Sequence, residues 1–230
     1  MTAPAARTPH DPDDLHAVLL SRWNALLLRA RGGATSPDPT PYGQELLGRW
    51  SEPQRRYHDR SHLLAVLNRV DELAPHVSGD PGFDLDAVLF AAWFHDAVYR
   101  PDRSENEERS AHLAERALPE AGVADALTAE TARLVRLTVT HDPSPGDTNG
   151  AVLCDADLAV LAGSPEEYAR YASDVREEYA FVPDPVFREG RAEVLRQLLA
   201  PERLFRTRYG RDNWEHTARR NLSTELELLT

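Results

Sequence analysis

Apolar residues recur at helical spacing along nearly the whole chain. In residues 13–31 they fall close to one face of a helix, at Leu15, Val18, Leu19, Leu26 and Leu27. A longer amphipathic helix is predicted to begin at Ser51, with Gln54 at the third position of a capping box. Its apolar stripe consists of Leu63, Val66, Leu67, Val70 and Leu73. No segment shows the sustained alternation typical of a half-buried strand, so an all-α fold is predicted.

One predicted helix, residues 86–99, is apolar on nearly every side. A helix of this kind is typical of the centre of a fold. Ser104 is predicted to begin the next helix, with Glu107 at its capping-box position, and Ser164 to begin a later one. Further helices are predicted over residues 128–140, 152–162, 186–200 and 212–229, with Asp212 and Glu215 capping the last.

The composition is that of a soluble globular protein. The chain has 230 residues, 41% hydrophobic and 28% charged, which is enough for one good core. We expect a disordered tail over residues 1–12, which are rich in Pro and Ala, followed by a single helical domain over residues 13–230. The formal net charge of −12 disfavours a nucleic-acid polymer or an anionic membrane as partner, because both attract clustered Lys and Arg.

No targeting or membrane segment is recognised. The first twelve residues lack the apolar centre of a signal peptide. The longest apolar run, residues 87–94, is far shorter than the ~20 residues that span a bilayer. Cys154 is the only cysteine, so an intramolecular disulfide is impossible. These features predict a cytoplasmic protein.

The pair His95-Asp96 lies inside the most apolar predicted helix. An unpaired buried carboxylate is costly, so Asp96 needs a hydrogen bond, an ion pair or a bound cation. No Lys or Arg lies between Val70 and Arg100 to pair with it. A cation shared by His95 and Asp96 is one interpretation. A buried His-Asp hydrogen bond or a distant arginine is the other.

His58 and His62 favour the metal interpretation. They are four residues apart and are predicted to share one face of the helix from Ser51. His62 lies at the edge of the apolar stripe, whereas His58 fits a surface position more readily. Imidazole and carboxylate ligands together suit Zn, Mn, Fe, Ni or Co and single out none of them.

A fourth ligand is expected from Asp155 or Asp157, which lie in an apolar segment further along the chain. Residues two apart point about 200° apart on a helix, so both cannot face one site. Asp157 shares a face with Leu153 and Val160 and is favoured as the ligand, and Asp155 fits a helix N-cap better.

Four motifs follow one another in order: Tyr57-His58-x-x-x-His62, Phe94-His95-Asp96-x-Val98-Tyr99, Asn106-Glu107-x-x-Ser110-Ala111 and Asp155-Ala156-Asp157-Leu158. With them, and with the later Val175-Arg176-x-Glu178-Tyr179 and Gly190-Arg191, the chain resembles the predicted metal-dependent phosphohydrolases of the HD-domain superfamily over roughly residues 42–229. The resemblance implies a helical HD-domain bundle. It also implies one divalent metal ion (Zn, Mn, Fe, Ni, Co or Mg) held by His62, His95, Asp96 and Asp157.

Other residues are candidates for catalysis or substrate binding. Glu107 either caps its own helix or acts as a general acid or base beside the metal. Arg176 and Arg191 either bind a substrate phosphate through their guanidinium groups or pair with glutamates at helical spacing. His58 is a further candidate for contact with substrate.

A second His-Asp pair, His141-Asp142, precedes Pro143, which restricts Asp142 to extended geometry. We therefore expect His141 at a helix end and Asp142 outside the metal's ligands. His141 there either stabilises the helix dipole or contacts substrate.

The residues and the resemblance together predict metal-assisted hydrolysis of a small phosphorylated molecule such as a nucleotide. A metal-bound water would attack phosphorus, with Asp96 accepting its proton. Two alternatives remain open. One is a non-enzymatic ligand-binding or sensor module with an HD fold, and the other is an HD-type di-iron oxidative enzyme, which needs a larger ligand set.

Overall fold

The computed structural model describes residues 12–229, and every regular element in this range is helical, which confirms the all-α prediction. The tail predicted for residues 1–12 lies outside the described residues, apart from Pro12, which begins the first helix. The elements in chain order are α1 (Pro12–Ala30), α2 (Thr40–Arg49), α3 (Arg60–Val77), α4 (Leu85–Phe94), α5 (Asn106–Glu120), α6 (Asp125–Leu137), α7 (Thr148–Leu158), η1 (Ala159–Ala162), α8 (Pro165–Glu178), α9 (Asp184–Leu199), α10 (Arg208–Asn213) and α11 (Glu215–Leu229).

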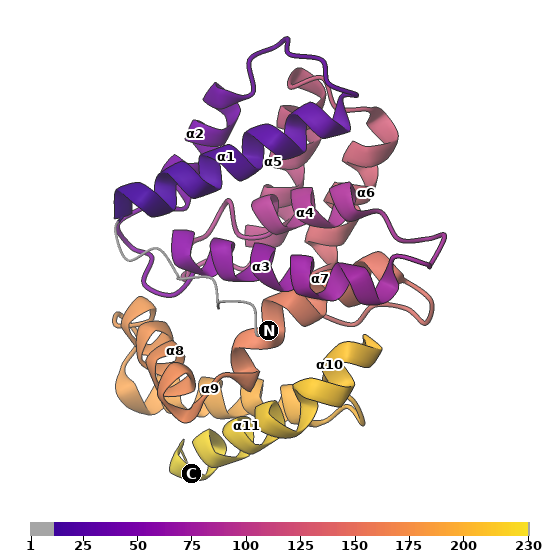
Figure 1. Ribbon diagram of the computed structural model, residues 1–230. Coiled ribbons are helices and arrows are strands. Elements are labelled where there is room, and N and C mark those ends of the chain that lie inside the picture. The colour runs from indigo at the N-terminus through magenta and orange to yellow at the C-terminus, as the bar shows by residue number, and fades with distance from the viewer. Residues whose placement is uncertain (1–11, 230) are drawn as a thin grey trace.

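The helices form two groups, one above the other in Figure 1. The upper group contains α1 to α7, and α4 lies among α1, α3, α5, α6 and α7, all of which contact it. The lower group contains α8 to α11. The short 3-10 helix η1 leads from one group to the other and packs against both α8 and α11. None of the helices in residues 12–229 is long and apolar enough to cross a membrane.

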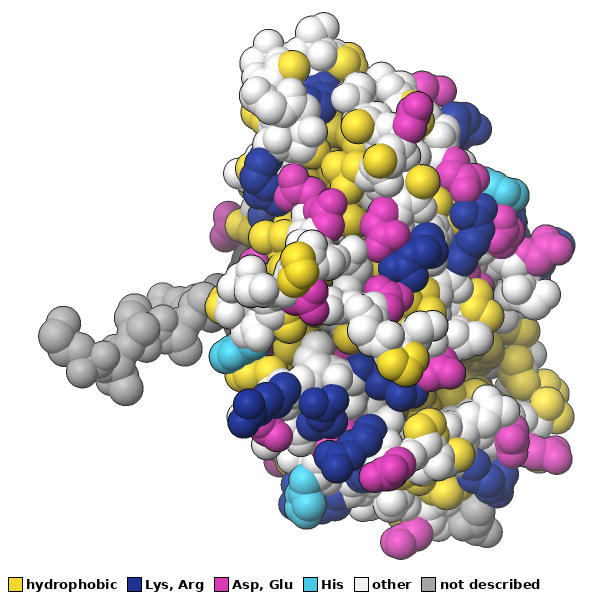
Figure 2. Space-filling model, turned by 90° about the vertical axis from the view of Figure 1, so that its right-hand side faces the viewer, with side chains coloured by type: hydrophobic (Ala, Val, Ile, Leu, Met, Phe, Trp, Pro, Cys, Tyr) yellow, Lys and Arg dark blue, Asp and Glu magenta, His cyan; other side chains and the backbone are white. Residues whose placement is uncertain are grey.

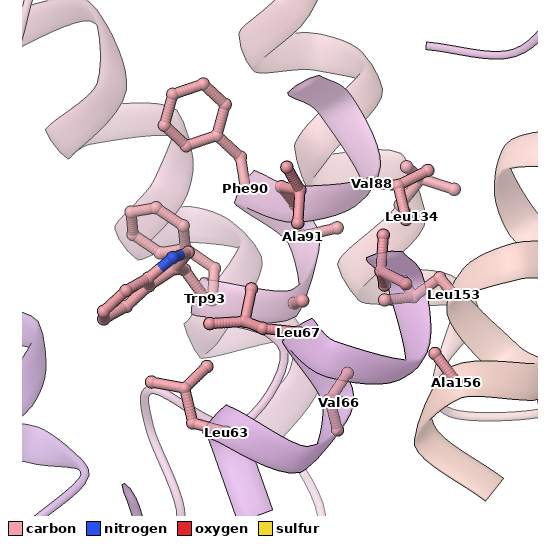
Figure 3. Close-up of a cluster of buried hydrophobic side chains, with 14 of the residues drawn as sticks. Leu63, Val66, Leu67, Val88, Phe90, Ala91, Trp93, Leu134, Leu153 and Ala156 are labelled. Atoms are coloured by element: carbon pink, nitrogen blue, oxygen red, sulfur yellow. The ribbon is translucent and has the colours of Figure 1, made fainter. Parts of the chain in front are cut away.

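The predicted central helix is the core of the upper group. Asp84 caps α4 by accepting the backbone N–H groups of Asp86 and Ala87. Every residue from Ala87 to Phe94 is buried. Figure 3 shows side chains of α4 meeting those of α3, α6 and α7 in one cluster. Each fully buried Val, Leu or Phe side chain contributes about 1.5–3 kcal/mol, so this cluster holds the ends of α3, α4 and α7 in fixed relation.

The first turn of α3 differs from the prediction. The helix begins at Arg60, where Asp59 caps it by accepting the N–H groups of Ser61 and His62. Ser51 does not cap a helix, because its hydroxyl donates to the Leu47 carbonyl. Residues 51–59 carry no apolar stripe to bury, so the helix starts where the stripe does. The prediction that His58 shares a helix face with His62 is therefore wrong.

The end of α4 and the start of α5 also differ from the prediction. α4 ends at Phe94, and His95 forms its C-cap, so Asp96 lies beyond the helix. α5 begins at Asn106, and no side chain caps it. Instead, the Asn106 side chain accepts the backbone N–H of Arg100 and donates to the backbone carbonyl of Arg100. The predicted capping box of Ser104 and Glu107 is wrong, because these hydrogen bonds between residues six apart hold the chain before α5 in another conformation.

In the lower group the capping box at Ser164 is present, as predicted. The helix predicted over residues 212–229 is divided at Trp214 into α10 and α11. Asp212 lies inside α10, whose cap is Thr207, which accepts the Gly210 N–H. The segment before α10 is held to α7, because Asp155 of α7 accepts the N–H groups of Arg206 and Thr207.

Candidate metal centre

Three side chains from three different helical segments converge between α3, α4 and α7. His62 comes from the first turn of α3, His95 from the end of α4 and Asp157 from the last turn of α7. The Nε2 atoms of the two histidines are 3.2 Å apart. Asp157 Oδ1 lies 3.2 Å from His62 Nε2 and 3.6 Å from His95 Nε2. Both imidazole rings are almost completely buried.

These distances fit the donor set of a metal ion. Ligand atoms bound about 2.0–2.2 Å from one ion lie roughly 3.0–3.6 Å from one another. His95 Nδ1 is 2.9 Å from the Ala92 carbonyl, and a proton donated there leaves Nε2 free as a ligand. His62, His95 and Asp157 therefore form a buried group that could hold a metal ion, in agreement with the sequence prediction for these three residues.

The electrostatics of the group favour a cation. Burial disfavours a charged His95 ring, but the carboxylates of Asp96 and Asp157 outweigh it and raise the pKa of His95 well above its usual value. Burial would also raise the pKa of Asp157, yet the neighbouring histidines, His95 foremost, lower it well below its usual range. A site that attracts a proton this strongly also attracts a metal ion in the proton's place.

Asp96 lies at the edge of the group. Its Oδ2 is 3.3 Å from His95 Nε2 and 3.9 Å from His62 Nε2. Among residues 12–229, its carboxylate forms ion pairs with histidines alone. Arg55 does not pair with the Asp96 carboxylate. It donates instead to the backbone carbonyls of Asp96 and His58. The Asp96 carboxylate therefore interacts with the histidines, and its role as a fourth metal ligand stays a prediction.

Asp155 points away from the group, to the other side of α7. Its carboxylate is fully buried and accepts the N–H of Arg206 (2.7 Å), the N–H of Thr207 (2.8 Å) and the hydroxyl of Thr207 (2.6 Å). The N-cap of α7 is Asp147, which accepts the Gly150 N–H. Asp157, and not Asp155, therefore belongs to the group that could hold a metal ion, as the sequence predicted. The interpretation of Asp155 as an N-cap is wrong, because α7 begins at Thr148.

The second His-Asp pair is divided between two roles. His141 follows the end of α6 with a φ of 49°, and its Nε2 lies 2.8 Å from Asp157 Oδ2. Asp142 is exposed and forms an ion pair with Arg206 at 2.7 Å, outside the three-residue metal group. His141 therefore orients Asp157 from the side opposite His62, while Asp142 takes no part in the group.

A buried carboxylate that the sequence did not single out, Glu178, orients His58. Glu178 Oε1 accepts the backbone N–H groups of Arg56, Tyr57 and His58 at 2.8–3.0 Å. Its Oε2 lies 2.7 Å from His58 Nδ1 and accepts the Tyr99 hydroxyl at 3.0 Å. With Nδ1 held, the His58 Nε2 faces the metal group, 4.0 Å from the nearer oxygen of Asp96. The only sequence signal for Glu178 was the motif Val175-Arg176-x-Glu178-Tyr179, which did not indicate that Glu178 contacts His58.

Replacing Glu178 with Gln is expected to destabilise the fold at neutral pH by about 3 kcal/mol, and by less in acid. Burial would raise the pKa of Glu178, but the hydrogen bond and charge of His58 and the backbone N–H groups lower it to about 2. Folding lowers the pKa of this carboxyl, so its stabilising contribution is complete when the pH is above the unfolded-state pKa near 4.5. The contribution is lost as the pH falls toward 2.

The measurement is the free energy of urea unfolding of both proteins from pH 7 to pH 3. Glu177→Gln, which changes the exposed neighbour, is the control and is expected to stay close to wild type throughout. A loss of stability in Glu178→Gln that does not depend on pH would contradict the assignment.

The predicted phosphate-binding arginines already have protein partners. Arg191 is buried, donates twice to the Glu225 carboxylate and once to the Tyr171 hydroxyl. Arg176 donates to two backbone carbonyls just after α8. Neither lines the cleft beside the metal group, so their role in phosphate binding stays a prediction without support from this geometry. Glu107 is partly exposed in the first turn of α5 and does not belong to the three-residue group.

A cleft of about 430 Å³ opens beside His62 and Asp157. Tyr57 and Tyr171 form part of its wall, with their ring centroids 4.7 Å apart in an edge-to-face arrangement. Arg170 also lines it. The cleft is large enough for a small molecule, and a molecule bound in it would contact His62 and Asp157.

Comparisons with known proteins assign no family to this arrangement. No family model, curated protein or solved structure matches the chain. Membership of the HD superfamily stays a prediction from the sequence motifs.

Proposed function

We propose that this protein is a metal-dependent hydrolase of small phosphorylated molecules with an HD-type helical fold. The observation that carries the proposal is the convergence of His62, His95 and Asp157 at 3.2–3.6 Å beside an open cleft. A purely structural metal site is normally closed by protein ligands, whereas a catalytic site keeps a position open to water or substrate. The adjoining cleft supports the catalytic alternative.

In this proposal His62, His95 and Asp157 hold one divalent ion, with Asp96 as the fourth ligand. Such an ion would supply a Lewis acid for a phosphoryl oxygen and would lower the pKa of a bound water toward about 7. Asp96, at the edge of the group, would accept the proton of that water. His58, held through Nδ1 by Glu178, presents Nε2 to an oxygen of the substrate.

We assign the recognition of the phosphate to Arg170 in place of Arg176 and Arg191. Arg170 lines the cleft, and within the described residues its side chain forms no hydrogen bond or close ion pair, with the Asp174 carboxylate as a more distant charged neighbour. Asp59 and Asp174 also line the cleft and repel long chains of phosphate. A phosphomonoester with a polar, uncharged remainder, such as a nucleoside monophosphate, fits these charges better than an oligophosphate.

The test is elemental analysis of the purified protein, followed by a phosphate-release screen over sugar phosphates and nucleotides with each candidate metal. We expect about one ion per chain and turnover that a chelator abolishes. Arg170→Gln is expected to raise KM several-fold at unchanged metal content, because it removes a contact to the substrate alone. Arg208→Gln, which changes a side chain that is 90% exposed, is the matched control.

Two results would overturn the proposal. Binding of phosphorylated ligands without turnover, in protein stripped of metal, would favour the sensor module. Two iron ions per chain with oxygen consumption would favour the oxidative enzyme.

A further inference from the structure

A second pair of cavities lies apart from the metal cleft and is lined mainly by arginines. The two adjoining pockets, of about 440 and 290 Å³, share Arg49, Val98 and Arg109. Their walls come from the end of α2, the segment between α4 and α5, and α5 itself. We call this surface the arginine groove and define it by Arg49, Arg100, Arg103, Arg109 and Arg116. None of these residues lines the cleft beside His62 and Asp157.

The positive charge of the arginine groove is poorly balanced by the protein. Within the described residues, Arg109 and Arg116 form no ion pair or side-chain hydrogen bond with any neighbour. Arg100 and Arg103 approach Asp102 only at 3.8 Å, beyond hydrogen-bond distance. The one acidic residue lining the groove, Glu52, is engaged by Gln54 and Arg55. Among the carboxylates of residues 12–229, only Glu45 lies within hydrogen-bond distance of one of the five arginines, Arg49.

Arginines elsewhere on this surface behave differently. Arg136 binds Glu108 and Glu115 at 2.7–2.8 Å, and Arg133 binds Glu130 and Asp147 at 2.7–3.0 Å. On the face drawn in Figure 2, acidic and basic side chains alternate over most of the upper half. With 38 acidic residues against 26 basic ones, carboxylates are abundant. A concave surface where four of five arginines lack a hydrogen-bonded carboxylate within the described residues is therefore suited to an anion from outside the chain.

We infer that the arginine groove binds a small oligophosphate anion, such as a pyrophosphate or triphosphate group. Guanidinium groups bind phosphate oxygens through paired hydrogen bonds and keep their charge at every physiological pH. A single phosphate would reach one part of this elongated groove, whereas two or three linked phosphates would contact arginines from both the α4–α5 segment and α5. The net charge of −12 opposes a nucleic-acid polymer, which would extend over the acidic surface around the groove.

The experiment is isothermal titration of pyrophosphate, tripolyphosphate and orthophosphate into the full chain with a chelator present, so that no metal ion bridges to the cleft. Tripolyphosphate is expected to bind at micromolar concentration, more tightly than orthophosphate, and more weakly as salt is added. The double variant Arg109→Gln/Arg116→Gln is expected to weaken binding by about tenfold or more. Neither side chain forms a hydrogen bond or ion pair with residues 12–229, so the variant is expected to keep the melting temperature of wild type.

Two further variants separate the groove from other sources of binding. Arg208→Gln/Arg220→Gln removes the same charge from exposed positions on α10 and α11, and is expected to bind like wild type. His95→Ala, which disrupts the metal group, is also expected to bind like wild type. Wild-type affinity in the groove variant, lost affinity in His95→Ala, equal affinity for orthophosphate, or no binding below about 1 mM would each overturn the inference.

Discussion

Replacing Asp157 with Asn is expected to empty the metal group and to abolish any hydrolysis that depends on it. The Asp157 carboxylate supplies negative charge between two buried imidazole nitrogens, at 3.2 and 3.6 Å, and the amide supplies none. Loss of a residue that only supports a metal ligand typically lowers affinity 10–100-fold, so loss of the ligand charge is expected to lower it by about 100-fold or more. Metal content after dialysis and competition with a chromogenic chelator measure the change.

The matched control is Asp142→Asn, the same substitution in the other His-Asp pair. Asp142 is exposed and pairs with Arg206, so its variant is expected to keep both metal and activity. Asp96→Ala is expected to lose both, because it removes the carboxylate proposed as fourth ligand and proton acceptor. Full metal content in Asp157→Asn would contradict the metal group. Full content in Asp96→Ala alone would remove only Asp96 from the ligand set.

Replacing Asp155 with Asn is expected to lower the free energy of unfolding by about 2–4 kcal/mol. Three donors, from Arg206 and Thr207, converge on its fully buried carboxylate. The amide nitrogen of Asn would face one of these donors and leave it without an acceptor. The loss also loosens Thr207, which caps α10.

Urea unfolding near pH 8 is the suitable measurement, because burial raises the pKa of Asp155 only to about 6 and the carboxylate is ionised there. Asp142→Asn again serves as the control, with an expected change within about 0.5 kcal/mol. A loss of less than about 1 kcal/mol in Asp155→Asn would show that the three hydrogen bonds do not hold the segment before α10 to α7.

Local pattern was enough to predict the helices and the centre of the fold. The apolar faces of α1 and α3 and the apolar sides of α4 are periodic in the sequence, and burial follows that period. The choice of Asp157 over Asp155 was also local, because two residues on one helix cannot face the same point and Asp157 shares its face with apolar neighbours. The capping box at Ser164 needs only residues three apart.

Helix ends near the site were decided by contacts between distant residues. Ser51 and Gln54 match a capping box, but Glu178, 120 residues beyond His58, holds the backbone before α3 in another conformation. At the start of α5 the contact is closer in sequence, because Asn106 binds the backbone of Arg100 six residues before it. Glu178 cannot be identified from local spacing, because hydrogen-bond donors are satisfied by whichever acceptor the tertiary fold brings within reach.

The difference between what local sequence determines and what tertiary structure decides is clearest for the charged residues. The sequence by itself determined that His62, His95 and Asp157 lie on apolar helices, and this alone suggested a shared ion. Only the tertiary structure decided that Arg191 meets Glu225, that Asp155 meets Thr207, and that Arg109 and Arg116 of the groove meet no carboxylate within the described residues. Burial is periodic along a helix and so is encoded locally, whereas the partner of a charge depends on which helices pack together.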